Sequence, residues 1–228
     1  MADAKLSKKL VAELVGTLFF VFLGAGSVLA VSAFNIPGYL AIPVIALANG
    51  LALALAVSAT MGVSGGHLNP AVSIAALVAK KINVRNAAAY IVAQLVGATI
   101  GALLLYGFFP AQVAAATALG APSLSSSVTV LQAIFIEGLL TFFLVFAVFG
   151  TAIDTRAPKI GGFGIGLTVF LDAIIGGPLT GAAMNPARAL GPMIASLAFA
   201  NWYVYVIGPI IGGIIAALVY SKLIMGSK

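Results

Sequence analysis

A nine-residue stretch that occurs twice in this chain decides the fold. Residues 64–72 read SGGHLNPAV, and residues 180–188 read TGAAMNPAR. Each copy contains Asn-Pro-Ala, and the residues concerned are Asn69, Pro70, Ala71, Asn185, Pro186 and Ala187. Asparagine is a favoured N-cap and proline is favoured at the first helical position, so each copy predicts that a helix begins at its asparagine.

The apolar stretches around these motifs predict an all-α membrane protein. Charged residues make up 7% of the 228 residues and hydrophobic residues 62%, whereas soluble domains have about 25% and about 45–50%. The stretches that follow the motifs, about 70–79 and about 186–197, are too short to cross a bilayer and are candidate re-entrant half-helices. Six other segments are long enough for transmembrane helices, roughly 9–33, 40–60, 86–107, 128–151, 162–178 and 202–224.

The basic residues predict how the chain crosses the membrane. Under a six-span arrangement, ten of the eleven Lys and Arg residues fall on one side, which the positive-inside rule assigns to the cytoplasm together with both termini. These ten are Lys5, Lys8, Lys9, Lys80, Lys81, Arg85, Arg156, Lys159, Lys222 and Lys228. The net charge of +6 is therefore explained by topology, and not by nucleic-acid binding. Residues 1–9 run into the first span without a cleavable signal pattern, so we expect that span to be retained.

The two halves of the chain also match each other in order. The paired features are Glu13 and Thr17 with Glu137 and Thr141, Gly50 with Gly166, the two Asn-Pro-Ala segments, and Gly97 and Gly101 with Gly208 and Gly212. Each half holds three spans, an odd number, so the second half must enter the membrane from the opposite side. The sequence predicts an inverted-topology repeat with halves at about 1–115 and 125–228.

Two intact Asn-Pro-Ala motifs at corresponding places in a six-span inverted repeat resemble the aquaporins, the major intrinsic protein family, over nearly the whole chain. The resemblance implies six tilted transmembrane helices and two half-helices that meet at the bilayer midplane, in a single channel domain over residues 1–228. It further implies a homotetramer in the cell membrane with one pore per subunit. The implied function is a passive channel for water, and also for small uncharged solutes, that excludes protons and ions.

The motif asparagines have a specific expected role in such a pore. If each cap uses the side-chain oxygen, the amide nitrogens of Asn69 and Asn185 remain as donors that orient one water molecule. The two helix N-termini, each the positive end of a dipole, would repel cations there. The alternative is that both asparagines are only caps.

The residues before each asparagine are expected to expose backbone carbonyls to water, because irregular backbone in a bilayer must be buried or line water. The pore-lining carbonyls predicted in this way belong to Gly65, Gly66, His67, Gly181, Ala182 and Ala183. We interpret His67 as a structural residue of its loop rather than a proton sensor. Glu13 and Glu137 are carboxylates within spans, and the resemblance implies that each holds the loop of its own half rather than relaying protons.

Arg188 is costly where it stands, because a cation is disfavoured in the first turn of a helix. The matching residue in the first half is Val72, so the repeat does not require a charge there. The resemblance implies that Arg188 belongs to a selectivity filter with Asn49, Ala173 and Ala182. Strict water channels resemble one another in having an aromatic at the position of Asn49 and often a histidine at that of Ala173. Both are absent here, and the small Asn49, Ala173 and Ala182 predict a wider opening.

Two polar residues allow more than one interpretation. Asn49 could line the pore or join packed helices. Asp172 adjoins Ala173 but projects about 100° away around its helix. Its expected role is a buried hydrogen bond or a subunit contact, and pairing with Arg188 is the alternative.

Other classes of protein are less compatible with this composition. The chain has no cysteine and one histidine, which leaves no thiolate metal site and argues against an enzyme, a metal site or a cofactor. A glycerol or other small-solute facilitator of the same family is the main alternative. A secondary transporter, which also uses inverted repeats and broken helices, is a remote one.

Overall fold

The apolar segments and both Asn-Pro-Ala segments are helical in the computed structural model, which describes residues 5–158 and 160–226. Within that part of the chain no residue is in a β-strand. Six helical segments are long and apolar enough to cross a membrane: Leu6–Ala33, Gly38–Ser64, Val84–Gly107, Val130–Ile153, Gly161–Thr180 and Val204–Ile224. The predicted fold class is therefore confirmed. Of the residues used above, 1–4, Lys159 and Lys228 lie outside the described part.

The elements follow one another in this order: α1 (Leu6–Ala33), α2 (Gly38–Ser64), α3 (Pro70–Val78), α4 (Val84–Leu104), η1 (Leu105–Gly107), α5 (Ala111–Ala116), η2 (Ala118–Gly120), α6 (Val130–Val148), η3 (Phe149–Ile153), α7 (Gly161–Thr180), α8 (Pro186–Ser196), α9 (Val204–Val219) and η4 (Tyr220–Ile224). The half-helices are α3 and α8, and both begin at the predicted proline.

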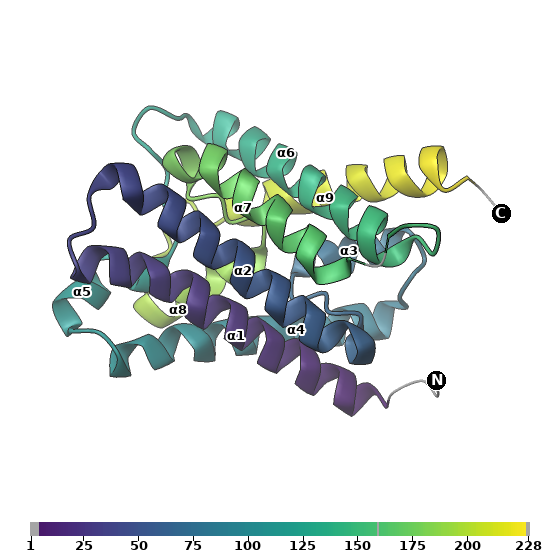
Figure 1. Ribbon diagram of the computed structural model, residues 1–228, viewed down its shortest axis with the longest axis horizontal. Helices are drawn as coiled ribbons and strands as arrows, with labels where there is room; N and C mark the ends of the chain where they lie inside the picture. Colours follow the sequence, from purple (N-terminus) through teal and green to yellow (C-terminus); the bar gives the residue numbers. More distant parts are fainter. Residues whose placement is uncertain (1–4, 159, 227–228) are drawn as a thin grey trace.

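Figure 1 shows the long helices side by side, with the start of α1 and the end of α9 at the same end of the bundle. The half-helix α3 lies toward that end and α8 toward the other. Each half-helix packs against a long helix of the other half, α3 against α9 and α8 against α4. The two halves therefore interlock, and neither forms a separate layer.

Close helix crossings put the matched glycines in a different register from the one expected. A Cβ on Gly97 would overlap the carbonyl oxygen of Leu14, and a Cβ on Gly212 would overlap that of Gly138. Leu14 and Gly138 each follow the glutamate within the first span of their half, Glu13 or Glu137. Gly97 is thus equivalent to Gly212, one helical turn from the pairing with Gly208 that the sequence suggested. The error arose because both helices carry glycines four residues apart, so two alignments fit equally well.

The connection between α4 and α6, which lies outside the six expected spans, is partly helical. Here α5 is followed by η2, where Ala118, Leu119 and Gly120 all have positive φ. Gly120 lies so close to α1 that a Cβ would come within 2.7 Å of the carbonyl oxygen of Ala25. The turn and its close contact with α1 therefore fix the position of the Gly120 carbonyl.

At the end where α1 begins, one ion pair fastens the connection between α6 and α7. Nη2 of Arg156 lies 2.6 Å from Oδ2 of Asp154 and also donates to the carbonyl of Ile224 at 3.2 Å. Hydrogen bonds from the Arg156 side chain and then its backbone N–H lower the pKa of Asp154 to about 2. Because the pKa is lowered on folding, the ionised carboxylate stabilises the fold at every pH above its unfolded pKa of about 4. This stabilisation is lost as the pH falls toward 2. This contact therefore persists at physiological pH.

Candidate pore and selectivity filter

Each half-helix begins at the asparagine of its Asn-Pro-Ala motif. Asn69 has an extended backbone, and its Oδ1 accepts a hydrogen bond from the N–H of Ala71 at 2.8 Å. Oδ1 of Asn185 accepts from the N–H groups of Ala187 at 2.9 Å and Arg188 at 3.2 Å. The proline after each asparagine occupies the first helical position, where its missing N–H costs nothing.

The two asparagines also tie the two loops together. Nδ2 of Asn69 donates to the carbonyl of Met184 at 3.0 Å, and Nδ2 of Asn185 donates to the carbonyl of Leu68 at 2.9 Å. Each amide has two hydrogens, so one remains on each asparagine after this contact. Both side chains are buried, with 2% exposure. The arrangement brings the N-termini of α3 and α8 to one place in the protein.

The loops before the asparagines share a backbone conformation. Positive φ occurs at three matched pairs of positions, Gly65 and Gly181, Gly66 and Ala182, and Leu68 and Met184. The residues at the position between, His67 and Ala183, donate their N–H groups to the two buried glutamates. Backbone of this kind at membrane depth is tolerated where it is buried in protein or lines water.

Glu13 accepts four hydrogen bonds within the first half. Its Oε1 accepts from the hydroxyl of Ser64 at 2.6 Å and the N–H of His67 at 2.9 Å. Its Oε2 accepts from the N–H of Leu68 and from Nε2 of Gln94, both at 2.7 Å. The carboxylate therefore bridges the end of α2, the loop and α4.

Glu137 makes the equivalent contacts in the second half. Its Oε1 accepts from the hydroxyl of Thr180 at 2.7 Å and the N–H of Ala183 at 3.0 Å, and its Oε2 accepts from the N–H of Met184 at 2.8 Å. Glu13 and Glu137 are both fully buried. Each satisfies N–H groups that the irregular loop would otherwise leave unpaired in the membrane.

Two tyrosines that the sequence analysis did not assign to the site hold the same loops. The hydroxyl of Tyr90 donates to the carbonyl of Ser64, and that of Tyr205 donates to the carbonyl of Thr180, each at 2.8 Å. Aligning Gly97 with Gly212 also aligns Tyr90 with Tyr205. The signal that would have found them was therefore the correct repeat register.

His67 lies against polar residues of the first half that also escaped the sequence analysis. Its Nδ1 is 3.1 Å from the hydroxyl oxygen of Ser73, and its ring contacts that of Tyr90 edge to face at a centroid distance of 5.2 Å. Gln94 donates to Ser73 as well, at 3.0 Å. The ring nitrogen thus has a partner within the protein.

All four expected filter residues line one cavity of about 190 Å³ at the α8 end of the pore: Asn49, Ala173, Ala182 and Arg188. Gly120, Pro122 and Ser123, from the connection before α6, form another part of its wall. The remaining wall is formed by Val28, Ile42, Ile45, Ala121, Gly177 and Gly181. The cavity is therefore lined by one charged side chain and a few polar groups among small or aliphatic side chains.

Arg188 is held by one acceptor from the first half and one from the connection between the halves. Its Nε donates to Oδ1 of Asn49 at 3.3 Å, and its Nη1 donates to the carbonyl of Gly120 at 2.9 Å. Nδ2 of Asn49 in turn donates to the carbonyls of Gly24 at 3.2 Å and Ile45 at 2.8 Å. Asn49 therefore both joins α1 to α2 and lines the cavity, so the two interpretations of this residue are compatible.

A second cavity, of about 820 Å³, opens at the α3 end and is lined by Gly65, Gly66 and His67 among others. A space of about 10 Å³, lined by Asn69 and Val72 among others, adjoins this second cavity and shares Gly66 and His67 with it. Ala183 does not line these cavities and packs instead in the core beside Met193 and Tyr205. The other five loop residues do line these cavities, and the expected exposure of the Ala183 carbonyl to water stays a prediction.

Asp172 is not among the residues that line the filter. It does not line either large cavity, and among the described residues its Oδ2 is buried without a hydrogen-bond partner. Arg188 bonds to Asn49 and Gly120 and not to Asp172. The hydrogen bond expected for Asp172 is therefore not formed at Oδ2. In the part of the chain that the structure describes, no group of three or more His, Asp or Glu residues could hold a metal ion.

Six membrane-spanning segments, two half-helices that meet N-terminus to N-terminus, and a cavity on each side of the meeting point define an aquaporin-like fold. A family model for the major intrinsic proteins matches residues 1–220. The X-ray structure of the aquaglyceroporin from Plasmodium falciparum is similar with a TM-score of 0.87 at 25% identity, and the match covers 96% of this chain and 97% of that one.

Sequence comparison gives the same result. The probable aquaporin TIP3-2 of Arabidopsis thaliana is 42% identical over 233 residues, covering 95% of this chain and 83% of that protein. Aquaporin TIP4-4 of Zea mays is 40% identical over 232 residues, covering 98% and 89%. The chain belongs to the major intrinsic protein family.

Proposed function

We propose that this protein is a passive transmembrane channel that conducts water and small uncharged solutes and excludes protons and ions. The observation that carries the proposal is the 190 Å³ cavity in which Arg188 faces the small side chains of Asn49, Ala173 and Ala182. A neutral solute exchanges its water contacts there for the guanidinium N–H groups and nearby carbonyls. Relatives named as aquaporins and an aquaglyceroporin support this class of function, and the protein is a channel and not an enzyme.

Ion exclusion follows from fixed positive charge on the conduction path. Arg188 is 5% exposed and borders the 190 Å³ cavity at the α8 end, which we call the outer cavity. A cation that enters this cavity therefore meets a positive charge in a poorly hydrated place. The N-termini of α3 and α8 add two positive dipole ends where the two half-helices meet. The remaining N–H of Asn69 and of Asn185 would hold a water oxygen, and a water oriented in this way does not pass a proton along the file.

The hydrogen bonds of Asn49 and Arg188 indicate which polar groups of the filter remain free to contact a solute. Both Nδ2 hydrogens of Asn49 are directed to the carbonyls of Gly24 and Ile45, so only its oxygen faces Arg188. No hydrogen bond joins Nη2 of Arg188 to another described residue, so this group is available to a solute. The filter therefore offers donors and space, which suits glycerol, urea, ammonia or hydrogen peroxide as well as water.

Stopped-flow measurements on proteoliposomes test this function directly. Water, glycerol, urea, ammonia and hydrogen peroxide are offered in turn, with protein-free liposomes as the control. We expect water flux with a low activation energy, flux of at least one larger solute, and no coupling to a proton or sodium gradient. Coupled flux would indicate a secondary transporter, and absence of water flux with strong glycerol flux would indicate a facilitator.

The facilitator is the second candidate function. The similarity to the Plasmodium falciparum aquaglyceroporin favours it, since that structure covers nearly the whole chain. The filter lacks the aromatic side chains that glycerol facilitators are expected to place against the carbon backbone of the solute. We therefore propose mixed water and solute conduction as the primary function.

We also propose that the protein forms a homotetramer in the cell membrane, with both termini in the cytoplasm. Six spans, an even number, return the chain to the side on which it starts, and Figure 1 shows the start of α1 and the end of α9 at one end of the bundle. The sequence assigns ten of the eleven basic residues to that side. The tetramer is supported by resemblance to the family. Size-exclusion chromatography with light scattering tests the oligomer, and protease access to a tag at each terminus in sealed vesicles tests the orientation.

A further inference from the structure

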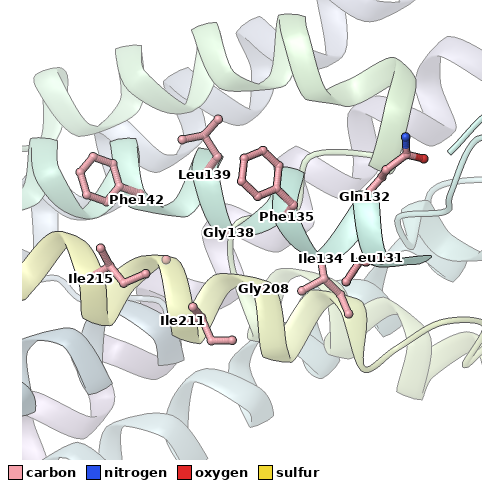
Figure 2. Close-up of a pocket in the computed structure, with 11 residues that line it drawn as sticks. Leu131, Gln132, Ile134, Phe135, Gly138, Leu139, Phe142, Gly208, Ile211 and Ile215 are labelled. Carbon is pink, nitrogen blue, oxygen red and sulfur yellow. The ribbon is translucent and has the colours of Figure 1, made fainter. Parts of the chain in front are cut away.

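A groove of about 690 Å³ runs between α6 and α9 on the outside of the bundle (Figure 2). Its walls come from exposed side chains of both helices, including Phe135 and Leu139 of α6 and Ile211 and Ile215 of α9. Apart from Gln132 and its three glycines, every residue that lines the groove has an apolar side chain. The groove is separate from the pore, because none of its residues lines either pore cavity.

Glycines at the helix crossing create this groove. Gly138, Gly208 and Gly212 form its floor, and a Cβ on Gly212 would overlap the carbonyl oxygen of Gly138. The residue equivalent to Gly138 in the first half is Leu14, since each follows the buried glutamate of its half. At this crossing the second half therefore lacks the side chain that Leu14 supplies in the first half. The volume that such a side chain would fill remains as part of the groove.

The position of the groove identifies the leaflet that it faces. Gln132 lies in the first turn of α6, where it forms a capping box with Thr129. Trp202 and Tyr203, at the same end of the protein, directly precede α9, and both side chains are partly exposed. Exposed Trp and Tyr at the ends of spans mark the membrane–water interface. The groove thus starts at the interface on the side opposite the chain termini.

The length of the groove matches one leaflet. It extends along α6 from Leu131 to Phe142, which at 1.5 Å per residue is about 16 Å. Half of the hydrocarbon core is about 15 Å thick. The groove is also open to the outside of the single chain, since Leu131 is 77% exposed and Phe135 69% exposed. An acyl chain from one leaflet fits these limits, whereas a helix of a second copy would extend across both.

We propose that the groove between α6 and α9 binds one acyl chain of a glycerolipid from the leaflet opposite the termini. Oε1 of Gln132 accepts from the N–H and hydroxyl of Thr129 at 2.9 and 2.8 Å, while Nε2 donates to none of the described residues. Nε2 therefore remains to donate to an ester or phosphate oxygen of the lipid at the mouth of the groove. The proposal requires that the chain spans a membrane and does not depend on which solutes the pore conducts.

The test measures phospholipid phosphorus retained per chain after extensive exchange into detergent. The parent protein is expected to retain about one phospholipid per chain. Gly138→Leu, which restores the side chain of the first half, and Ile211→Trp, which fills the groove from its wall, are expected to lose it. Val96→Trp is the matched control, because Val96 is an exposed span residue of α4 outside the groove.

Two further measurements keep the result interpretable. Water flux of each variant reports folding, and Ile211→Trp covers the case in which Gly138→Leu, whose Cβ would lie 3.3 Å from the Gly208 carbonyl oxygen, does not fold. Gln132→Glu keeps the acceptor for Thr129 but removes the donor, so faster lipid exchange is expected. Absence of lipid in the parent, or equal retention in the filled variants, overturns the proposal. Loss of oligomers in the filled variants without loss of lipid overturns it in favour of a second copy.

Discussion

Arg188 and Asn49, which are 139 residues apart, are joined by a hydrogen bond from Nε to Oδ1 at 3.3 Å. The bond links α8 of the second half to α2 of the first. Because Asn49 is itself fixed by the carbonyls of Gly24 and Ile45, it supplies a rigid acceptor. The carbonyl of Gly120 supplies another at 2.9 Å. The charge in the filter therefore has one fixed position, and substitutions of Asn49 change both the width of the filter and the support of that charge.

Arg188→Val is expected to admit cations while water still passes. A unit charge about 8 Å away contributes roughly 2 kcal/mol at an effective dielectric constant near 20, which corresponds to more than tenfold in permeability. Cation and proton currents across voltage-clamped membranes measure the effect, with Arg188→Lys as the control that keeps the charge. Unchanged selectivity in Arg188→Val would contradict the proposed role of this residue.

Ala182→Cys is expected to make the channel sensitive to mercury, since Ala182 lines the outer cavity. The parent protein has no cysteine, so low concentrations of mercury are expected to leave its water flux unchanged. The neighbouring Ala183→Cys is the matched control, because Ala183 packs in the core and does not line that cavity. A folded Ala182→Cys variant that conducts normally in mercury would argue against this placement.

Glu137→Gln is expected to destabilise the protein by about 2–3 kcal/mol. The amide would turn one acceptor into a donor that faces an N–H or hydroxyl, and hydrogen bonds to charged groups contribute about 1.5–3 kcal/mol. Glu13→Gln is the comparison from the other half. It is expected to lower the free energy of unfolding by at least as much, because Glu13 also accepts a hydrogen bond from Gln94. Unfolding in detergent measures both, and unchanged stability in either variant would contradict the structural role of that glutamate.

Asp172→Leu is expected to raise stability by about 1–3 kcal/mol, because it replaces a buried oxygen that has no partner with an apolar group. Water flux and ion selectivity are expected to stay the same, since Asp172 borders neither pore cavity. Asp172→Asn, which retains a polar group of similar shape, is the control. If Asp172→Leu altered selectivity, Asp172 would have to act on the filter.

Much of the fold could be predicted because hydropathy and the Asn-Pro pairs are local signals. The expected half-helices at 70–79 and 186–197 correspond to α3 and α8, which begin at Pro70 and Pro186. The predicted span 40–60 ends four residues before α2 does. The helix continues to Ser64 because it ends only where Gly65 adopts a positive φ. Composition around residue 60 contains no comparable stop signal.

The filter was less accessible to sequence reasoning. The sequence alone could not reveal that the carbonyl of Gly120 bonds Arg188, because any residue can supply a carbonyl and the position depends on the strained turn at Ala118 and Leu119. Tyr90 and Tyr205 were missed because the glycines of α4 and α9 fit two registers. Local patterns therefore predicted the elements, whereas contacts between distant segments required the structure.

The width of the filter is tested by restoring bulk to it. Asn49→Phe combined with Ala173→His places large side chains at two positions that border the outer cavity. We expect flux of glycerol, urea or another larger solute to fall much more than water flux, because only the larger solute needs the space that these side chains would fill. Stopped-flow measurements on proteoliposomes give both fluxes from the same preparation.

The single variant Ala173→His separates width from charge placement in this experiment. It narrows the cavity but keeps Asn49, and with it the acceptor of the Arg188 Nε–H bond. If Ala173→His also reduces larger-solute flux selectively, then width controls selectivity. If only the double variant does so, release of Arg188 from Asn49 is the cause. An unmodified protein that conducts water but none of the larger solutes would refute the wide-filter proposal, because the small side chains at 49, 173 and 182 would then not determine what passes.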